Sequence, residues 1–201
     1  MIYPTHTGIP RGDRPLVALD IDGVCADFVR GVQAGRAHHG RQPLVEVHRD
    51  LFRDLDAEQK RELEDFIQAP NFCARLELLP GAQDAVFRIG QIADLMVVTT
   101  PWWGSPTWVS ERRAWVQSCL NIAPDRIVFT SAKWSVPADV FVDDHERHIA
   151  EWRARHPHGT AFHWPASGEP TDWEPVIREV ERRAAQHAQH LAARSRVRVF
   201  Q

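Results

Sequence analysis

Cysteine is scarce in this sequence, which has three such residues, at positions 25, 73 and 119, and no CxxC spacing. Neither a disulfide framework nor a zinc site is indicated, and we expect a protein of a reducing, cytoplasmic compartment. An uncharged apolar run of about 18 residues is also missing, as is an N-terminal basic region followed by an apolar one. We therefore expect neither a membrane span nor export.

Positive charge is not in excess either, because 24 Lys and Arg residues stand against 27 Asp and Glu, for a net charge of −3. No stable nucleic-acid partner is expected, and a small anionic ligand would have to be held by local groups. With 43% hydrophobic and 25% charged residues, the 201-residue chain has a globular composition. It is long enough for one full core carrying a small insertion.

Short apolar runs that end in polar residues recur along the chain and predict buried β-strands. They lie at residues 16–19, 95–98, 127–129 and 140–142, with a weaker fifth at 160–164. Stretches with helical character follow or separate them at 82–91, 106–120, 146–155 and 173–194. This alternation predicts an α/β fold, in which helices sandwich a Rossmann-like parallel sheet.

The segment 30–79 interrupts the alternation, since it is charged, lacks strand-like runs and contains one helical candidate at 56–68. We interpret it as a small helical cap inserted after the first strand. Residues 1–29 and 80–201 would then form the catalytic core. In the last helix, one stripe of side chains is predicted to pack against the core. Its members are Trp173, Val176, Ile177, Val180, Ala184 and Leu191.

Polar residues stand where the predicted strands end. They are Asp20 and Asp22 after the first, Thr99 and Thr100 after the second, Ser131 after the third, and Asp143 and Asp144 after the fourth. The carboxyl ends of parallel strands meet at one rim of the sheet, where ligands bind in folds of this class. The sequence therefore predicts a functional site at that rim.

The predicted rim suits the hydrolysis of a phosphate monoester, which needs a nucleophile, an acid for the leaving oxygen and compensating positive charge. Four converging carboxylates would raise one another's pKa unless a cation lay among them. Oxygen ligands without His or Cys favour Mg²⁺ over Zn²⁺. Lys133 would add positive charge and Thr99 a hydroxyl donor, while Gly23 lets the backbone turn toward a ligand.

Each of these elements has a simpler explanation when it is taken alone. The Asp-x-Asp-Gly pattern often only ends a strand, an Asp pair often caps a turn or helix, and a lone lysine is usually a surface residue. Their order along the chain, each after the strand that the chemistry requires, favours the catalytic interpretation.

The motifs resemble those of a known superfamily. Leu19-Asp20-Ile21-Asp22-Gly23-Val24, Val98-Thr99, Lys133 and Val142-Asp143-Asp144 are similar to the four motifs of the haloacid dehalogenase superfamily of phosphatases. A narrower resemblance, to the 5'(3')-deoxyribonucleotidase family, rests on residues 20–28, on Ala69-Pro70-Asn71-Phe72 with Leu79-Pro80-Gly81-Ala82, on Thr99-Thr100-Pro101 and on the spacing from Lys133 to the Asp pair.

The resemblance implies a phosphatase that works through an aspartyl-phosphate intermediate. Asp20 would be the nucleophile, and Asp22 would act first as general acid and then as general base. Mg²⁺ would be held by Asp20, by the backbone carbonyl of Asp22 and by Asp144.

The resemblance also implies how the phosphoryl group is held. Thr99, Thr100 and Lys133 would bind it, and Asp143 would orient Lys133 from behind. The family usually has Ser where Thr100 stands.

The substrate pocket is where the chain departs most from this family. Phe28 and Phe72 would line a nucleoside pocket, but Ile67 occupies a position where the family has an aromatic side chain. Trp102 and Trp103 make the loop after the second motif unusually aromatic. Either one could stack on a base, whereas the alternative for the tryptophans is core packing or a subunit interface, which leaves a homodimer open.

Three functions are consistent with these observations. The cap motifs and Phe28 favour a nucleoside monophosphate as the substrate. Ile67 and the altered loop favour a sugar phosphate or another metabolite phosphate, with the same chemistry. A non-catalytic protein that retains the fold would be expected to carry a damaged motif, and none is damaged.

Overall fold

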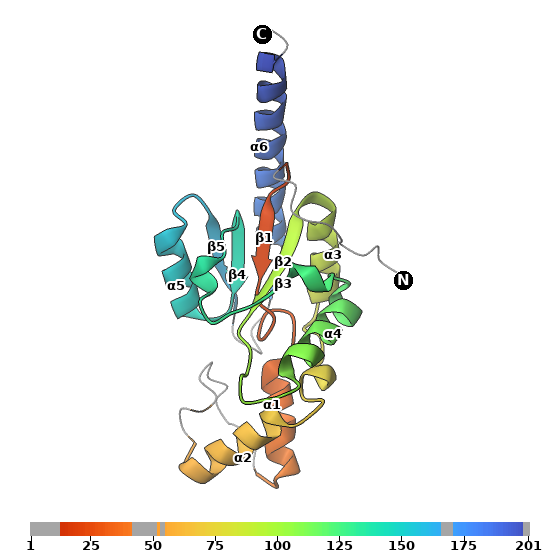
Figure 1. Ribbon diagram of the computed structural model, residues 1–201, viewed down its shortest axis with the longest axis vertical. Helices are drawn as coiled ribbons and strands as arrows, with labels where there is room; N and C mark the ends of the chain where they lie inside the picture. Colours follow the sequence, from red (N-terminus) through yellow and green to blue (C-terminus); the bar gives the residue numbers. More distant parts are fainter. Residues whose placement is uncertain (1–12, 42–51, 53–54, 166–170, 199–201) are drawn as a thin grey trace.

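One parallel sheet forms the centre of the protein (Figure 1). The computed structural model describes residues 13–41, 52, 55–165 and 171–198, with side chains described as far as residue 192. The strands are β1 (Leu16–Leu19), β2 (Asp94–Thr99), β3 (Ile127–Phe129), β4 (Val140–Asp143) and β5 (Thr160–His163), in the order β3-β2-β1-β4-β5. The predicted α/β fold is therefore confirmed, including the weaker fifth strand.

Helices cover both faces of the sheet. α3 (Ala82–Ile92), α4 (Trp108–Leu120) and α6 (Glu174–Arg198) share one core cluster with Val17 and Leu19, while α5 (Glu146–Arg155) shares a second cluster with Ala18. Successive side chains of a strand point to opposite faces, so β1 supplies both cores. Because every residue of β1 apart from its first is fully buried, the strand holds the loop that follows it firmly in place.

Two further helices lie beyond the carboxyl ends of the strands (Figure 1). They are α1 (Phe28–His38) and α2 (Ala57–Gln68), and the short 3-10 helix η1 (Cys73–Arg75) follows them. The predicted helix at 56–68 is confirmed as α2, and its first turn carries a capping box between Asp56 and Gln59. The sequence did not predict α1. Residues 42–51 and 53–54 of the segment assigned to the cap lie outside the described residues.

The last helix, α6, begins against the body and then extends away from it, on the side opposite α1 and α2 (Figure 1). Four members of its predicted stripe, namely Trp173, Val176, Ile177 and Val180, are buried. The prediction is wrong for Leu191, which is 40% exposed because the helix continues past the core that it packs against. Within the described residues, no helix combines the length and the apolar character needed to cross a membrane.

Candidate active site

The ends of β1 and β4 bring three charged side chains together. The two strands are neighbours, and their pairing of Leu19 with Val142 continues in a hydrogen bond from the Asp20 amide to the Val142 carbonyl. Asp20 and Asp143 consequently lie side by side. Lys133, in the short 3-10 helix η3 (Lys133–Ser135), places its Nζ 2.7 Å from Asp20 Oδ2 and 2.8 Å from Asp143 Oδ2. All three side chains are almost completely buried.

A cation fits beside this group of charges. Asp20, Asp143 and Asp144 each offer a carboxylate oxygen, and these oxygens lie within 4.8 Å of one another. Gly23 makes room for Asp144, because a Cβ at Gly23 would lie 2.2 Å from Asp144 Oδ2 and the residue has a φ of +77°. A set of three carboxylates around a small space suits a hard divalent ion.

The pKa of Asp20 reflects this crowding. Burial raises it from 3.8 to about 6, the charge of Lys133 opposes the rise, and the charges of Asp143 and Asp22 add to it. The ionised form of Asp20 is thus costly in the protein without a cation. A bound divalent ion would reduce that cost.

Asp143 is held by hydrogen bonds on both of its oxygens. Lys133 donates to Oδ2, the His145 amide donates to Oδ1, and His148 Nδ1 lies 3.1 Å from Oδ1. Burial alone would raise the pKa of Asp143, but the interactions with His148 and Lys133 hold it below its ordinary value. His145 is the N-cap of α5, and its Nδ1 accepts a hydrogen bond from the Arg147 amide.

Asp22 lies in the turn after β1, and its carboxylate meets a residue that the sequence analysis did not identify. Arg112 Nη2 donates to Asp22 Oδ1 over 2.6 Å, and the arginine side chain is completely buried. Helical spacing could have identified Arg112, because the spacing places this arginine on the same buried side of α4 as Trp108, Trp115 and Val116. A charged residue on an apolar stripe needs a partner.

The two threonines at the end of β2 differ in their surroundings. Thr99 is completely buried, and its Oγ1 has no hydrogen-bond partner in the part of the chain that the structure describes. Thr100 is exposed and donates its hydroxyl to the Thr130 carbonyl. A buried hydroxyl without a partner is rare and costly, so Thr99 is the better placed of the two to bind a ligand oxygen.

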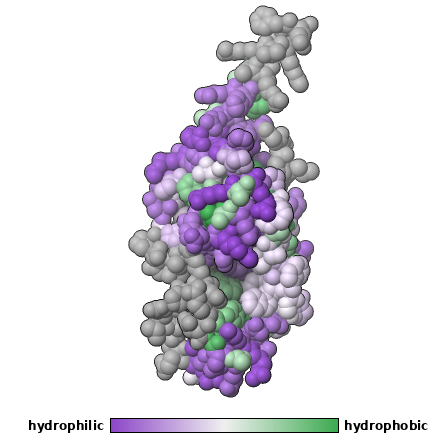
Figure 2. Space-filling view, turned by 90° about the vertical axis from the view of Figure 1, so that its left-hand side faces the viewer, coloured by the Kyte–Doolittle hydropathy of each residue, from purple (hydrophilic) through white to green (hydrophobic). Residues whose placement is uncertain are grey.

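An aromatic cluster joins α1, the segment after α2 and the start of α4. The Phe28 and Phe72 rings meet edge to face at 5.6 Å, and the Phe72 ring stacks on Trp108 at 5.9 Å. Trp102 lies 6.3 Å from Trp108. Trp103 does not join this cluster, because its side chain is 74% exposed. Figure 2 shows a patch of hydrophobic surface between the part of the molecule that contains the sheet and the part that contains α1 and α2.

Backbone groups between α2 and η1 are tied to the core. The Glu111 carboxylate accepts hydrogen bonds from the Asn71 and Cys73 amides, and Ser105 Oγ donates to the Gln68 carbonyl. The Asp27 amide, before α1, donates to the Glu77 carbonyl. Hydrogen bonds therefore hold both the segment that precedes α1 and the segment that follows α2.

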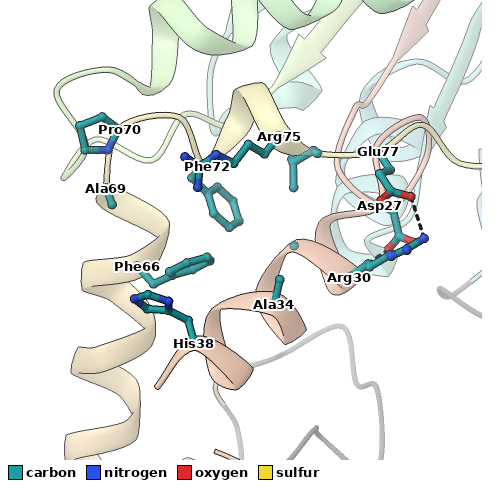
Figure 3. A pocket seen from close by; sticks show the side chains of 12 residues that line it. Asp27, Arg30, Ala34, His38, Phe66, Ala69, Pro70, Phe72, Arg75 and Glu77 are labelled. Carbon is teal, nitrogen blue, oxygen red and sulfur yellow. Dashed lines mark hydrogen bonds and ion pairs between the residues drawn. The ribbon is translucent and has the colours of Figure 1, made fainter. Parts of the chain in front are cut away.

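A separate hollow of about 310 Å³ lies between α1, α2 and η1 (Figure 3). Phe66 and Phe72 point into it, and Arg30, on its rim, forms an ion pair with Glu77. Its lining contains none of the carboxylates of the metal cluster and neither Thr99 nor Lys133. The hollow is thus distinct from the site at the rim of the sheet.

Comparisons with known proteins agree with this geometry. Residues 14–173 match the family model described as "5' nucleotidase, deoxy (Pyrimidine), cytosolic type C protein". The human protein "5'(3')-deoxyribonucleotidase, cytosolic type" is 31% identical over 139 residues, which are 64% of this chain and 69% of the relative. A "putative 5'(3')-deoxyribonucleotidase" of Staphylococcus epidermidis is 23% identical over 155 residues, covering 75% of this chain and 85% of that protein.

Solved structures resemble the chain in fold. A haloacid dehalogenase-like hydrolase of Streptococcus pneumoniae aligns with a TM-score of 0.54 at 12% identity, covering 84% of this chain and 91% of that one. Another, from Burkholderia xenovorans, aligns with a TM-score of 0.51 at 18% identity, covering 82% and 96%. The five-stranded sheet and its helices therefore have the haloacid dehalogenase-like fold.

Proposed function

This chain belongs to the 5'(3')-deoxyribonucleotidase family of haloacid dehalogenase-type hydrolases, and we propose that it hydrolyses nucleoside monophosphates in the presence of Mg²⁺. The observation that carries the proposal is the buried Asp20–Lys133–Asp143 group, with Asp144 and Asp22 beside it. A carboxylate fixed next to a buried ammonium and a metal-binding cluster is suited to attack a phosphoryl group.

The phosphoryl group would be bound by two residues. The Thr99 hydroxyl, which has no partner among the described residues, would donate to one phosphoryl oxygen. Lys133 would offset the charge of the others. Burial alone would lower its pKa, but the charges and hydrogen bonds of Asp20 and Asp143 raise the pKa and keep the ammonium protonated. Asp143 would hold Lys133 in place, since both of its carboxylate oxygens are engaged in hydrogen bonds.

The reaction would run in two steps. First, a carboxylate oxygen of Asp20 attacks phosphorus, the bond from phosphorus to the ester oxygen breaks, and Asp22 gives its proton to the departing oxygen. Second, the Asp22 carboxylate removes a proton from water, whose oxygen attacks the phosphorus of the aspartyl phosphate. The bond from phosphorus to the Asp20 oxygen breaks, the Asp20 carboxylate keeps the electron pair, and inorganic phosphate leaves. Both aspartates return to their starting states.

Asp20, Asp144 and the backbone carbonyl of Asp22 would hold the metal ion. When bound, Mg²⁺ would neutralise charge on the phosphoryl oxygens and on the carboxylates around it. The cost of ionising the buried Asp20 supports a cation at this position.

The aromatic cluster supports a nucleoside as the leaving group. Phe28 and Trp102 would line its pocket, with Phe72 packed edge to face against Phe28 on the side of the separate hollow, while the exposed Trp103 contributes less. Residues 30–79 would form the cap over a core made of residues 1–29 and 80–201. The buried thiols of Cys25 and Cys73, both free, support a cytoplasmic location.

The test is phosphate release from a panel of deoxyribonucleoside and ribonucleoside 5'- and 3'-monophosphates and sugar phosphates, with Mg²⁺. Nucleotides should be hydrolysed with the highest kcat/KM, and Asp20→Asn should abolish turnover of all of them. Preferential hydrolysis of a sugar phosphate would redirect the proposal to a metabolite phosphatase, a reading that the aliphatic Ile67 favours. Undiminished activity of Asp20→Asn would refute the mechanism.

A further inference from the structure

The buried contact between Arg112 and Asp22 has a chemical consequence of its own. Arg112 Nη2 lies 2.6 Å from Asp22 Oδ1, and the arginine has no exposed surface, whereas the Asp22 side chain is 23% exposed. One end of the pair is therefore sealed in the protein and the other is open to the site. Such a pair can hold one carboxylate oxygen and leave the second one available.

Packing fixes the arginine from both sides. Its Cζ lies 5.1 Å from the centre of the Trp108 ring and 5.8 Å from that of Trp115, distances typical of cation–π contacts. Trp115 is itself anchored by a hydrogen bond from its Nε1 to the Leu76 carbonyl. The guanidinium therefore has little freedom to move away from Asp22.

Stability does not account for this arrangement. Arg112 Nε and Nη1 are buried without a nitrogen or oxygen partner among the described residues. Burying a cation whose donors are incompletely satisfied is costly, and an apolar side chain of similar length would avoid that cost. Among the described residues, the oxygen that the guanidinium binds belongs to Asp22, so the chemical role of that carboxylate is what explains a buried arginine at this position.

We propose that Arg112 is a positioning residue for proton transfer, holding Asp22 Oδ1 so that Oδ2 faces the ester oxygen that leaves. This inference rests on the proposed function. As the bond from phosphorus to the ester oxygen breaks and the bond to Asp20 forms, the proton on Asp22 Oδ2 passes to the leaving oxygen, which keeps the electron pair of the broken bond. Arg112 gives up no proton and touches no substrate atom.

The inference predicts an effect that depends on the leaving group. A nucleoside alkoxide is a poor leaving group and needs the proton of Asp22, whereas p-nitrophenolate leaves with little help from an acid. Arg112→Met keeps the length of the side chain and removes its charge and its hydrogen bond. It should lower kcat/KM for the best nucleotide at least about tenfold more than kcat/KM for p-nitrophenyl phosphate, part of the factor of about 10² to 10⁴ typical of a general acid.

Two further variants make the test specific. Arg113→Met removes an exposed arginine from the same helix without touching Asp22 or the aromatic cluster, so any loss that it causes should be equal for both substrates. Asp22→Asn should show the leaving-group dependence in full. Adding Arg112→Met to Asp22→Asn should bring no further loss that depends on the substrate.

The outcomes separate the two ideas. Equal losses on both substrates in Arg112→Met, or no loss, would overturn the role of Arg112 while leaving the hydrolase proposal intact. Failure of the wild-type protein to hydrolyse any nucleotide would refute the proposed function instead. If Arg112→Met does not fold, Arg112→Lys provides the same comparison, because a shorter cation without the planar fork should reproduce the leaving-group dependence in weaker form.

Discussion

The buried carboxyl of Asp20 makes the stability of the metal-free protein depend on pH in a definite direction. Its pKa in the folded protein is about 6, raised from 3.8 by burial. Between these values the unfolded chain releases the proton while the folded protein keeps it. The folded state therefore loses stability as pH rises through this window, and below 3.8 the contribution is fully present.

The size of this effect follows from the two pKa values. A rise in the pKa of Asp20 from 3.8 to about 6 corresponds to a loss of about 3 kcal/mol in the free energy of unfolding, because one pKa unit is worth about 1.4 kcal/mol. For a protein of this length, that is about 6 to 12 °C in Tm. A divalent ion that binds the ionised carboxylates should restore the lost stability at neutral pH and should change Tm little at pH 4.

The assay is calorimetric unfolding of the wild-type protein and of Asp20→Asn from pH 4 to pH 7.5, in EDTA and in Mg²⁺. Asparagine has nearly the same shape as aspartic acid and does not titrate in this range. The difference in Tm between the wild-type protein and the variant therefore reports on the ionisation of Asp20. In EDTA the difference should move against the wild type as pH rises, and Mg²⁺ should reverse it. A difference that does not change with pH in EDTA would refute the reasoning.

Three other predictions concern Thr99, Gly23 and Trp102. Thr99→Val should raise the free energy of unfolding by about 1 kcal/mol, and Tm with it, because it removes a buried hydroxyl that has no partner among the described residues. The same change should lower kcat/KM at least about tenfold. A lower Tm with unchanged kinetics would contradict this. Gly23→Ala should weaken the response of Tm to Mg²⁺, because its Cβ would displace Asp144, and an unchanged metal titration would argue against the cluster. Trp102→Ala should raise KM for nucleotides about tenfold, whereas Trp103→Ala, at an exposed position, serves as the matched control and should not. Equal KM values for the two tryptophan variants would remove Trp102 from the pocket.

The strands and their polar ends could be predicted from the sequence because they carry strong local signals. Buried parallel strands are continuous apolar runs, and the register between β1 and β4 then brings Asp20 beside Asp143 without further information. His148 was not predicted as a partner of Asp143, because this contact depends on how α5 turns back over the end of β4.

The first helix was missed because two glycines interrupt its sequence. α1 contains Gly31 and Gly35, which usually weaken a helix. Here they allow close packing, since a Cβ would lie 2.4 Å from Leu76 Cδ2 at Gly31 and 2.2 Å from Phe66 Cδ1 at Gly35. Tertiary contact, which local propensity cannot report, therefore stabilises α1.

Arg112 shows a similar limit at the candidate site. Its place on the buried stripe of α4 is readable from helical spacing, but its partner is 90 residues away along the chain. Only the folded structure connects the stripe to Asp22. The exposure of Leu191 has the same cause. Helical spacing predicts which residues share one side of the helix, but it does not predict where along the helix the contact with the core ends.

The most direct test of the mechanism is to find the phosphoryl group on Asp20. Asp22→Asn should let p-nitrophenyl phosphate transfer its phosphoryl group, because this leaving group needs little acid, and should slow the hydrolysis that follows, because the base is gone. Acid quenching and peptide mapping by mass spectrometry should then place the phosphate on Asp20. Phosphate on another residue, or release of p-nitrophenol at the wild-type rate with no phosphorylated peptide, would contradict the account.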